Sequence, residues 1–589
     1  MLNDKAVPRP EYPRPQMVRD RWMNLNGEWE FEMDHGKSGR ARKLHAADRL
    51  AGKIIVPFCP ESSLSGVEYK DFMASVWYRR EFHVPAEWQG QRVLLHFGAV
   101  DYEAEVWING VSAGRHQGGY SPFWIDITDL LVAGDNTVTV CAEDDIRSGL
   151  QSRGKQSAQY HSHQCDYTRT TGIWQTVWLE CVPRHYISGL KYIPDPDNRC
   201  LHIEGSLIGE ADGFVFSAEA TFGSKNAGNG RAVVTGQKVE LTLSLAEIHL
   251  WEPGVPNLYD LEVRLYHGNE CVDKVSSYFG LRSVKWNDRA ILINGKPIFQ
   301  RLILDQGFYP DGIYTAPSDA ALKNDIEISI GLGFNGARLH QKIFEPRFLY
   351  WADKLGYLVW GEHGSRGLDI TSPMGLERML PEWMEIVERD FNSPALIGWC
   401  PFNETWDVKA GPSRIAQDDE VLRIVYHVTK AIDRTRPVID ASGNYHVITD
   451  IFDIHDYEQD VEKFSARYEP MKTGGEVFNT FPDRQKYEGQ PYFLSEYGGI
   501  WWNPEQKDDK SWGYGDRPKS EEEFIARYKG LTDCLLDNPR ICAFCYTQLY
   551  DVEQEVNGLY TYDRKSKFDP EIIRKINSRT AAIEKESSR

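Results

Sequence analysis

The chain has 589 residues, more than one hydrophobic core organises, and this length favours about three domains. Its hydrophobic fraction of 41% and charged fraction of 26% are those of an ordinary globular protein, and no stretch approaches the ~20 apolar residues of a membrane-spanning helix. The formal net charge of −20 argues against nucleic-acid and anionic-membrane partners, which bind basic surfaces.

The N-terminal segment of this sequence does not resemble an export signal. Residues 1–10 read Met-Leu-Asn-Asp-Lys-Ala-Val-Pro-Arg-Pro and lack the apolar core of a signal peptide, so we expect a cytoplasmic protein. The ten cysteines fit reduced, buried thiols. Cys542 and Cys545 have CxxC spacing, but they lie in an apolar run without a second pair, and we expect no metal or redox role there.

Residues 1–183 predict an all-β domain. Val76–Val84 alternates apolar and polar residues at the period of a strand, and Asn109-Gly110 is a strong hairpin signal. Further strands are expected at Val93–Phe97, Glu103–Ile108 and Thr137–Cys141. Many short strands separated by Gly, Pro and Asn are typical of a sandwich or jelly roll.

Residues 184–283 continue the β pattern over about a hundred residues, which suits an immunoglobulin-like sandwich. The expected strands are Leu201–Gly205, Phe214–Ala220, Val239–Leu245 and Tyr259–Tyr266. Segment 223–236 is rich in Gly, Asn and Lys, and we expect it to be a flexible loop.

From residue 284 to 589 strands and helices alternate, which predicts a (β/α)₈ barrel. Helical patterns fall at Asp319–Ile330, Glu382–Asp390, Val421–Arg434 and Glu521–Leu536. The eight apolar strand candidates are Ile298–Leu304, Gly333–Leu339, Tyr357–Gly361, Leu396–Phe402, Val438–Ala441, Ile451–His455, Tyr492–Ser495 and Ile541–Tyr546.

Two of these strands end on a glutamate, the fourth at Glu404 and the seventh at Glu496. Strand carboxyl ends are where barrels gather their reactive groups, and two facing carboxylates can cleave a glycosidic bond. A retaining mechanism needs carboxyl groups about 5–5.5 Å apart, one a nucleophile and the other an acid and then a base. The acid needs a raised pKa, and we expect burial beside Trp399 and Trp406 to raise that of Glu404.

Several motifs resemble glycoside hydrolase family 2, the family of β-galactosidases, β-glucuronidases and β-mannosidases. They span nearly the whole chain and are Ser75–Phe82, Ala104–Gly110, Gly118–Phe123, Phe279–Ser283, Leu292–Pro297, Asn403-Glu404, Ser495-Glu496 and Gly558–Arg564. The resemblance implies a multidomain β plus α/β fold, with a jelly-roll sugar-binding domain, an immunoglobulin-like sandwich and a C-terminal TIM barrel. It also implies a homo-oligomer, since family members are often dimers or tetramers.

The same resemblance implies roles for single residues. Glu404 would be the general acid/base and Glu496 the nucleophile, with Asn403 on the sugar 2-hydroxyl. Tyr457 would hydrogen-bond the nucleophile, and Arg338 would lower its pKa. The remaining sugar-contacting positions are Asp166 in the first domain and Tyr546, a stacking platform at the end of the eighth strand.

Departures from the family pattern are informative. The usual Arg-x-x-His is here Arg338-Leu-His340, so His340 sits one position early, and facing the sugar and not facing it remain equal alternatives. No Glu-x-His pair follows Glu362, so we expect no catalytic metal and no cofactor. Trp501 and Trp512, in the loop after Glu496, are expected to line the aglycone side of the pocket or a lid, although loop packing would account for at least one tryptophan there.

The Asn-x-Lys that binds the substrate carboxylate in β-glucuronidases should precede Gly558, but Asp551–Asn557 is acidic here. An acidic rim repels a uronate, so the sequence favours a retaining exo-β-glycosidase of the β-galactosidase type, acting on small glycosides or oligosaccharides. The alternatives are a β-mannosidase, an α-L-arabinopyranosidase and a β-hexuronidase. The last would use other cations, such as Arg169, Arg338, Lys342 or Arg366. A non-catalytic carbohydrate-binding protein is the rival from another class.

Overall fold

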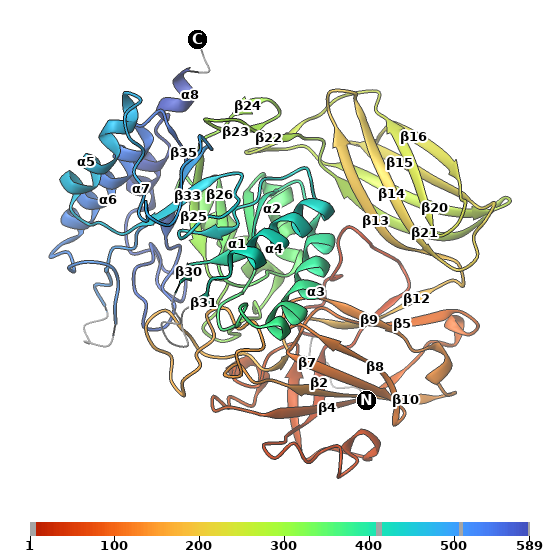
Figure 1. Ribbon diagram of the computed structural model, residues 1–589. Helices are drawn as coiled ribbons and strands as arrows, with labels where there is room; N and C mark the ends of the chain where they lie inside the picture. Colours follow the sequence, from red (N-terminus) through yellow and green to blue (C-terminus); the bar gives the residue numbers. More distant parts are fainter. Residues whose placement is uncertain (1–6, 408–414, 506–510, 587–589) are drawn as a thin grey trace.

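The computed structural model describes residues 7–407, 415–505 and 511–586 (Figure 1). Two β-sandwiches, coloured red to orange and yellow, flank a unit of helices and parallel strands, coloured green to blue. Residues 1–6, on which the expectation about export partly depends, lie outside the described residues. Residues 506–510, in the loop that carries Trp501 and Trp512, also lie outside them. Among the described helices none is both long and apolar enough to cross a membrane.

Strands β1 to β12 form the first sandwich, as predicted. Its sheets have the orders β1-β12-β5-β9 and β3-β2-β4-β10-β7-β8, beside a short pair of β6 and β11. The strands are Trp22–Asn24, Gly27–Met33, Gly52–Val56, Ser75–His83, Arg92–Phe97, Val100–Asp101, Glu103–Ile108, Val111–Gln117, Phe123–Asp126, Asp135–Glu143, Gly172–Ile173 and Val177–Val182. The predicted hairpin joins β7 to β8: Ile108 faces Val111, and Asn109 and Gly110 have φ of 51° and 77°, as a tight type I′ turn requires.

The second sandwich packs the sheet β13-β14-β17 on the sheet β16-β15-β20-β21. Its strands are β13 Tyr186–Asp195, β14 Cys200–Ile208, β15 Val215–Phe222, β16 Lys225–Val233, β17 Lys238–Ser244, β20 Tyr259–His267 and β21 Glu270–Phe279, with a short pair β18 Trp251–Glu252 and β19 Val255–Pro256. The loop expected at 223–236 is wrong, because most of it is β16. Gly228 and Gly230 let β16 approach Ser244 and Leu241, where a Cβ would lie 2.3 Å and 3.1 Å from their atoms.

The third unit contains one curled parallel sheet, in the order β28-β27-β26-β25-β35-β34-β33. These strands are β25 Gln300–Asp305, β26 Gly336–Leu339, β27 Leu358–Glu362, β28 Leu396–Cys400, β33 Phe452–Asp456, β34 Tyr492–Gly498 and β35 Ile541–Thr547. The predicted fifth strand is reduced to a bridge from Val438 to Trp399 and to β32 (Ala441–Ser442), which pairs with β29 (Phe402–Asn403). With it, all eight predicted strand positions are occupied and the barrel prediction is confirmed.

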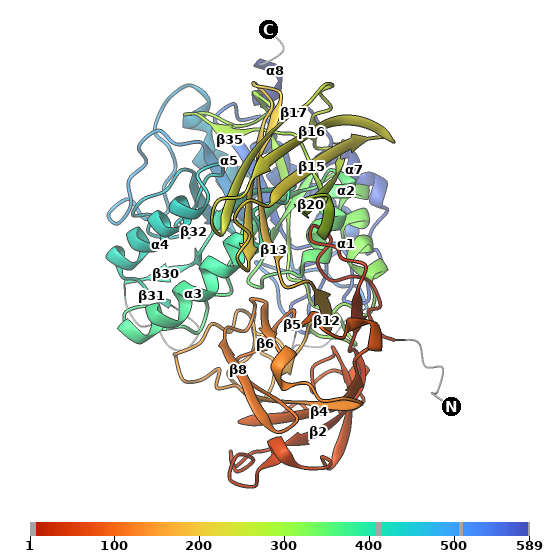
Figure 2. The same ribbon diagram turned by 90° about the vertical axis from the view of Figure 1, so that its right-hand side faces the viewer.

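Helices cover the outside of the barrel sheet, at the positions that the βαβ rhythm requires (Figure 2). They are α1 Asp319–Gly331, α2 Pro346–Leu355, α3 Pro373–Asp390, α4 Asp419–Ile432, α5 Val461–Lys472, α6 Glu521–Leu536, α7 Pro570–Asn577 and α8 Ala582–Glu586. Small sheets complete the unit: β22 Val284–Trp286, β23 Ile291–Ile293 and β24 Lys296–Pro297 at its entry, and β30 Thr405–Trp406 with β31 Ile415–Ala416 beyond Glu404. Helix α3 begins earlier than its predicted start, at Pro373, since proline suits a first helical turn.

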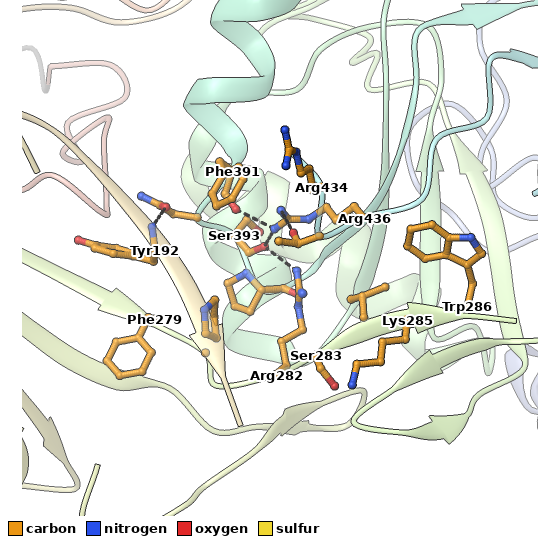
Figure 3. A pocket seen from close by; sticks show the side chains of 16 residues that line it. Tyr192, Phe279, Arg282, Ser283, Lys285, Trp286, Phe391, Ser393, Arg434 and Arg436 are labelled. Carbon is orange, nitrogen blue, oxygen red and sulfur yellow. Dashed lines mark hydrogen bonds between the residues drawn. The ribbon is translucent and has the colours of Figure 1, made fainter. Parts of the chain in front are cut away.

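A cavity of roughly 500 Å³ lies where the second sandwich meets the barrel (Figure 3). The buried guanidinium groups that line it already donate hydrogen bonds to the backbone. Arg282 donates to the carbonyls of Pro394 and Leu396, and Arg436 donates to those of Phe391 and Ser393. These donors satisfy backbone carbonyls, so the cavity is a junction between domains. Neither Glu404 nor Glu496 lines it.

The first sandwich sends a loop into the mouth of the barrel, visible in orange beneath it in Figure 1. The backbone N–H of Arg153 donates to the carbonyl of Arg366, and that of Gly154 donates to Gly364. Only glycine fits at 154, where φ is +54° and a Cβ would lie 2.1 Å from the carbonyl oxygen of Gln341. This close approach brings first-domain side chains to the carboxyl ends of the barrel strands.

Candidate active site

The two glutamates meet at the carboxyl end of the barrel. Glu496 lies within β34, and Glu404 directly follows β29 with φ of +48°, an uncommon conformation for a residue with a side chain. One carboxylate oxygen of each lies within 4.8 Å of the other and of Nδ1 of His455. This separation matches the spacing of retaining glycosidases and falls short of the roughly 6.5–9.5 Å of inverting ones.

Glu496 is buried and held on both oxygens. Arg338 donates from its NH1 to Oε1 over 2.9 Å, and the hydroxyl of Tyr457 donates to Oε2 over 2.5 Å. The ring of Tyr514 stacks on that of Tyr457 with centroids 3.4 Å apart and fixes its position. Both carboxylate oxygens of Glu496 therefore have a fixed hydrogen-bond donor.

Arg338 also orders the groups around Glu496. It donates to Oδ1 of Asn403 over 2.6 Å and to Oε2 of Glu362 over 2.7 Å. The first bond leaves the Nδ2 amide of Asn403 without a partner among the described residues, so it is available to a substrate hydroxyl. His340 places Nδ1 2.9 Å from Glu362 and Nε2 3.9 Å from Glu496, so it faces the nucleophile and the carboxylate of the third strand.

The pKa of Glu404 is not raised in the way that its sequence neighbours suggest. Burial acts to raise it, but the hydrogen bond and charge of His455, with Lys155 and Arg366 nearby, outweigh burial and lower this pKa to about 2. Trp399 does not contribute, because it points out of the barrel and donates to Asp433. The expectation of a desolvated, protonated Glu404 is therefore wrong for the ligand-free site.

His455 lies between the two glutamates and lowers the pKa of Glu404. Its Nδ1 lies 2.9 Å from Oε1 of Glu404 and 3.5 Å from Oε2 of Glu496. Burial opposes a charge on the ring, but the charge of Glu496 and the bond to Glu404 raise the pKa of His455 above its usual value. The three groups also offer the only ligand set at the described barrel mouth that would suit a metal ion.

Two cations from different domains enter this site. Lys155, on the inserted loop, is buried, and its charge lowers the pKa of both Glu404 and His340. Arg366 does the same from the barrel, and its Nε lies 3.2 Å from Oδ1 of Asp166. Asp166 is therefore in the site as predicted, paired with Arg366.

Tyr546 is not a stacking platform, which corrects the prediction. Its ring packs against Tyr497 and against Tyr528 of α6, on the outer side of the sheet. Side chains alternate along a strand, so the inward position belongs to Cys545, which feels the charges of Arg338 and Glu496.

The two loop tryptophans differ in their surroundings. The indole N–H of Trp512 donates to the carbonyl of Gln164, and its ring packs edge-on to Tyr514, so it links the loop after Glu496 to the first domain. Trp501 lies under the guanidinium of Arg517, 4.3 Å from its ring centroid. The structure thus places Trp512 beside the site and Trp501 within the packing of its own loop.

Family models describe three consecutive parts of the chain. Residues 22–183 match the sugar-binding domain of glycosyl hydrolases family 2, residues 208–282 match the domain that the family model calls glycosyl hydrolases family 2, and residues 284–505 match its TIM barrel domain. The chain belongs to glycosyl hydrolase family 2. It is a glycoside hydrolase, and the expected order of a jelly-roll, an immunoglobulin-like and a TIM barrel domain is confirmed.

Curated relatives and solved structures of family 2 include uronidases and galactosidases. A β-glucuronidase of Canis lupus familiaris is 25% identical over 72% of this chain and 69% of its own length. A β-galactosidase of Thermoanaerobacter pseudethanolicus is 25% identical over 67% of this chain and 52% of its own. The structure of a β-galacturonidase from Eisenbergiella tayi, 19% identical, superposes over 97% of this chain and 98% of its own with a TM-score of 0.75.

The sequence analysis of this family-2 chain missed four residues of the site: His455, Lys155, Tyr514 and Glu362 as a pocket group. A signal for His455 was present, because Asp453, His455 and Tyr457 alternate along one strand and share its inward face. Lys155 had no such signal, since only the fold brings its loop to the barrel.

Proposed function

We propose that this family-2 enzyme is a retaining exo-β-glycosidase that removes a terminal hexuronic acid, a β-glucuronide or a β-galacturonide. The observation that carries the proposal is Lys155. Lys155 is buried and its charge acts on Glu404, yet within the described chain its ammonium group has no hydrogen bond and no carboxylate oxygen within 4 Å. Burial acts to lower the pKa of Lys155, but the charges of Cys165, Glu555 and Glu496 outweigh it and raise this pKa, so the ammonium form is favoured and a substrate carboxylate would supply a direct partner.

Arg366 supports the same assignment. Its guanidinium lies beside Asp166 on one side and bonds to Sγ of Cys165 on the other, with Glu404 close enough to add to its charge stabilisation. An arginine and a lysine that converge on one pocket form a planar fork and a point charge, both suited to a carboxylate.

The other cations that were candidates for a substrate carboxylate already bind groups of the protein. Arg169 donates to the carbonyls of Ser157, Gln159 and Lys70, and Lys342 donates to those of Gly307 and Tyr314. Arg338 serves the nucleophile and its neighbours. These three are therefore not candidates for binding a substrate carboxylate.

The acidic stretch 551–557 does not form a repelling rim, which removes the argument for a neutral sugar. Asp551 pairs with Lys567, Glu553 accepts from the N–H of Thr168, and Glu555 accepts from Tyr167. Burial raises the pKa of Glu555 above its usual value. The named relatives also support a uronidase over the β-galactosidase type.

A double displacement fits the geometry. Glu496 attacks the anomeric carbon as the bond to the aglycone oxygen breaks, and Glu404 gives that oxygen a proton. Glu404 first receives this proton from Nδ1 of His455, 2.9 Å away. In the second half Glu404 takes a proton from water, whose oxygen attacks the anomeric carbon and releases Glu496. Glu404 then returns this proton to His455, so that the enzyme is restored and each turnover consumes one water molecule.

The test is a panel of p-nitrophenyl β-glucuronide, β-galacturonide and β-galactoside, with the Lys155→Met and Glu496→Gln variants. We expect one uronide to be the best substrate, and Lys155→Met to lower its kcat/KM about 10- to 150-fold, as loss of a charged hydrogen bond does. Activity on the neutral galactoside should change less than about threefold. A β-galactoside that exceeds both uronides would instead establish the galactosidase reading, which the Thermoanaerobacter relative favours.

A further inference from the structure

Among the residues that the structure describes, one group of side chains outside the active site has the composition of a metal site. Asp195, Cys200 and His202 lie on the hairpin of β13 and β14 in the second sandwich, and each offers one ligand atom within 4.8 Å of the others. Sulfur, imidazole nitrogen and carboxylate oxygen are the donors that zinc takes in proteins. We propose that these three residues bind one thiophilic divalent ion, Zn²⁺ or a close equivalent.

The strand register places all three side chains on one face. Asp195 is the direct partner of Cys200 across the hairpin, and His202 follows Cys200 by two residues. The intervening Leu201 and the following Ile203 point the other way, into the core of the sandwich. The backbone alone therefore fixes the three donors side by side, before any ion is present.

The separations suit a small tetrahedral ion. Sγ of Cys200 lies 3.6 Å from Nε2 of His202, and Nε2 lies 3.9 Å from Oδ2 of Asp195. Bond lengths of about 2.3 Å to sulfur and about 2.0–2.1 Å to nitrogen imply donors roughly 3.5 Å apart in a tetrahedron. The sulfur and the imidazole nitrogen already have this separation, whereas the carboxylate, whose side chain is partly exposed, would have to move toward them.

The neighbours orient the donors toward a shared point. Nδ1 of His202 lies 2.9 Å from Oγ1 of Thr242 on β17, so a hydrogen on Nδ1 leaves the Nε2 lone pair facing Cys200 and Asp195. Such a bond to the remote ring nitrogen is the usual support of a metal-binding histidine. Hydrogen bonds from Asn198 lower the pKa of Asp195 and keep it ionised.

Cys200 is buried, and burial together with Asp195 raises the pKa of its thiol. A metal ion would displace that proton and bind the thiolate. With three protein ligands the fourth position is left to water, so the ion would tie the hairpin turn to β14 without taking part in the chemistry at Glu404 and Glu496.

Cobalt(II) titration of the chelator-treated full chain tests the proposal, because a cobalt–thiolate bond gives a charge-transfer band in the near ultraviolet. We expect this band to saturate at one equivalent and to be displaced by Zn²⁺. It should vanish in Cys200→Ser and require at least about tenfold more cobalt in His202→Gln. The exposed Cys271, also in this sandwich, supplies the matched control Cys271→Ser, which should keep the band.

The cluster of Glu404, His455 and Glu496 contains no sulfur and cannot produce the band, so Glu496→Gln should titrate like the unaltered protein. Absence of the band in the folded full chain at millimolar cobalt would overturn the proposal, and so would its persistence in Cys200→Ser. If Cys200→Ser does not fold, His202→Gln decides, since His202 is partly exposed and its replacement leaves the core intact.

Discussion

Nδ1 of His455 lies 2.9 Å from Oε1 of Glu404. The same nitrogen lies 3.5 Å from Oε2 of Glu496, so one imidazole faces both reactive carboxylates. The pKa of His455 is raised and that of Glu404 is lowered, so the surroundings favour a proton on the histidine over one on Glu404. Coupled groups of this kind titrate as a unit, and the proton needed for glycoside cleavage belongs to the pair.

This relationship predicts the alkaline limb of the pH profile. Because the pKa of His455 is raised, its proton is present below that pKa and is lost as the pH rises through it, above the ordinary value of about 6.5. In His455→Asn the limb should move to lower pH, since only Glu404 is left to hold the proton. At pH 8 we expect kcat/KM to fall about 100-fold or more, the usual worth of acid catalysis.

The measurement is kcat/KM from pH 4 to 9 for both proteins. The neighbouring Asp456 points outward to Arg467 and Tyr468, so Asp456→Asn is the control that should leave the alkaline limb in place. Coincident alkaline limbs for His455→Asn and the unaltered enzyme would show that His455 does not share the proton.

Removal of the Tyr457 hydroxyl should slow both halves of the reaction. Tyr457→Phe deletes a 2.5 Å hydrogen bond to an ionised carboxylate, worth about 1.5–3 kcal/mol, so we expect kcat to fall about 10- to 150-fold. Tyr514→Phe keeps the stacked ring and has no hydroxyl bond to Glu496, so it should lose less than about threefold. Equal losses in the two variants would mean that ring packing, and not the hydroxyl bond, supports the nucleophile.

A buried histidine away from the reacting groups should govern stability at high pH. Burial opposes a charge on His446, but hydrogen bonds and charges from Asp440 and Asp453 outweigh it and raise the pKa of His446 to about 10. The protonated form of His446 contributes its full stabilisation to the fold below about pH 6.5. This stabilisation is lost as the pH rises through about 10. The melting temperature should therefore decline across that window.

His446→Asn leaves Asp440 and Asp453 buried without a countercharge, at a cost of about 3–5 kcal/mol. We expect a lower melting temperature at pH 7 and a flatter profile from pH 6.5 to 10, measured by differential scanning fluorimetry. The exposed His427 gives the control His427→Asn, which should match the unaltered protein. A His446→Asn profile as steep as that of the unaltered protein would contradict this assignment.

Strand periodicity and strand ends were sufficient to predict the barrel and the core of the site. Glu404, Glu496 and Asn403 follow from apolar runs that end at one face of a parallel sheet, whereas Arg338 was assigned through the family resemblance. The prediction that Tyr546 is a stacking platform was wrong. The end of a strand gives the position of a residue along the sheet, but its inward or outward direction depends on the register. Only pairing with β34 and packing on α6 set that register.

Lys155 and the proton on His455 could not be predicted in this way. The lysine belongs to a β-sandwich loop, and its distance to the barrel along the chain is well over a hundred residues. The pKa of Glu404 depends on three cations from separate segments, whose sum exceeds the effect of burial. Interactions that only the assembled domains create leave no periodic trace in the sequence.

The contact between domains supplies a last prediction, at Gly154. A methyl group there would lie 2.1 Å from the backbone oxygen of Gln341, so Gly154→Ala must push the inserted loop, and Lys155 with it, away from the barrel. We expect kcat/KM for the best substrate to fall about 10- to 150-fold, close to the effect of losing the ammonium group.

Gly149→Ala is the matched control, because Gly149 also has positive φ, +74°, but a Cβ there would lie 3.8 Å from its nearest neighbour. Both substitutions carry the backbone penalty of about 1–2 kcal/mol for a left-handed residue, so both should lower the melting temperature. Only Gly154→Ala should lose activity, measured at a temperature where both proteins are folded. If Gly154→Ala keeps the activity of Gly149→Ala, the first-domain loop does not hold Lys155 at the catalytic carboxylates.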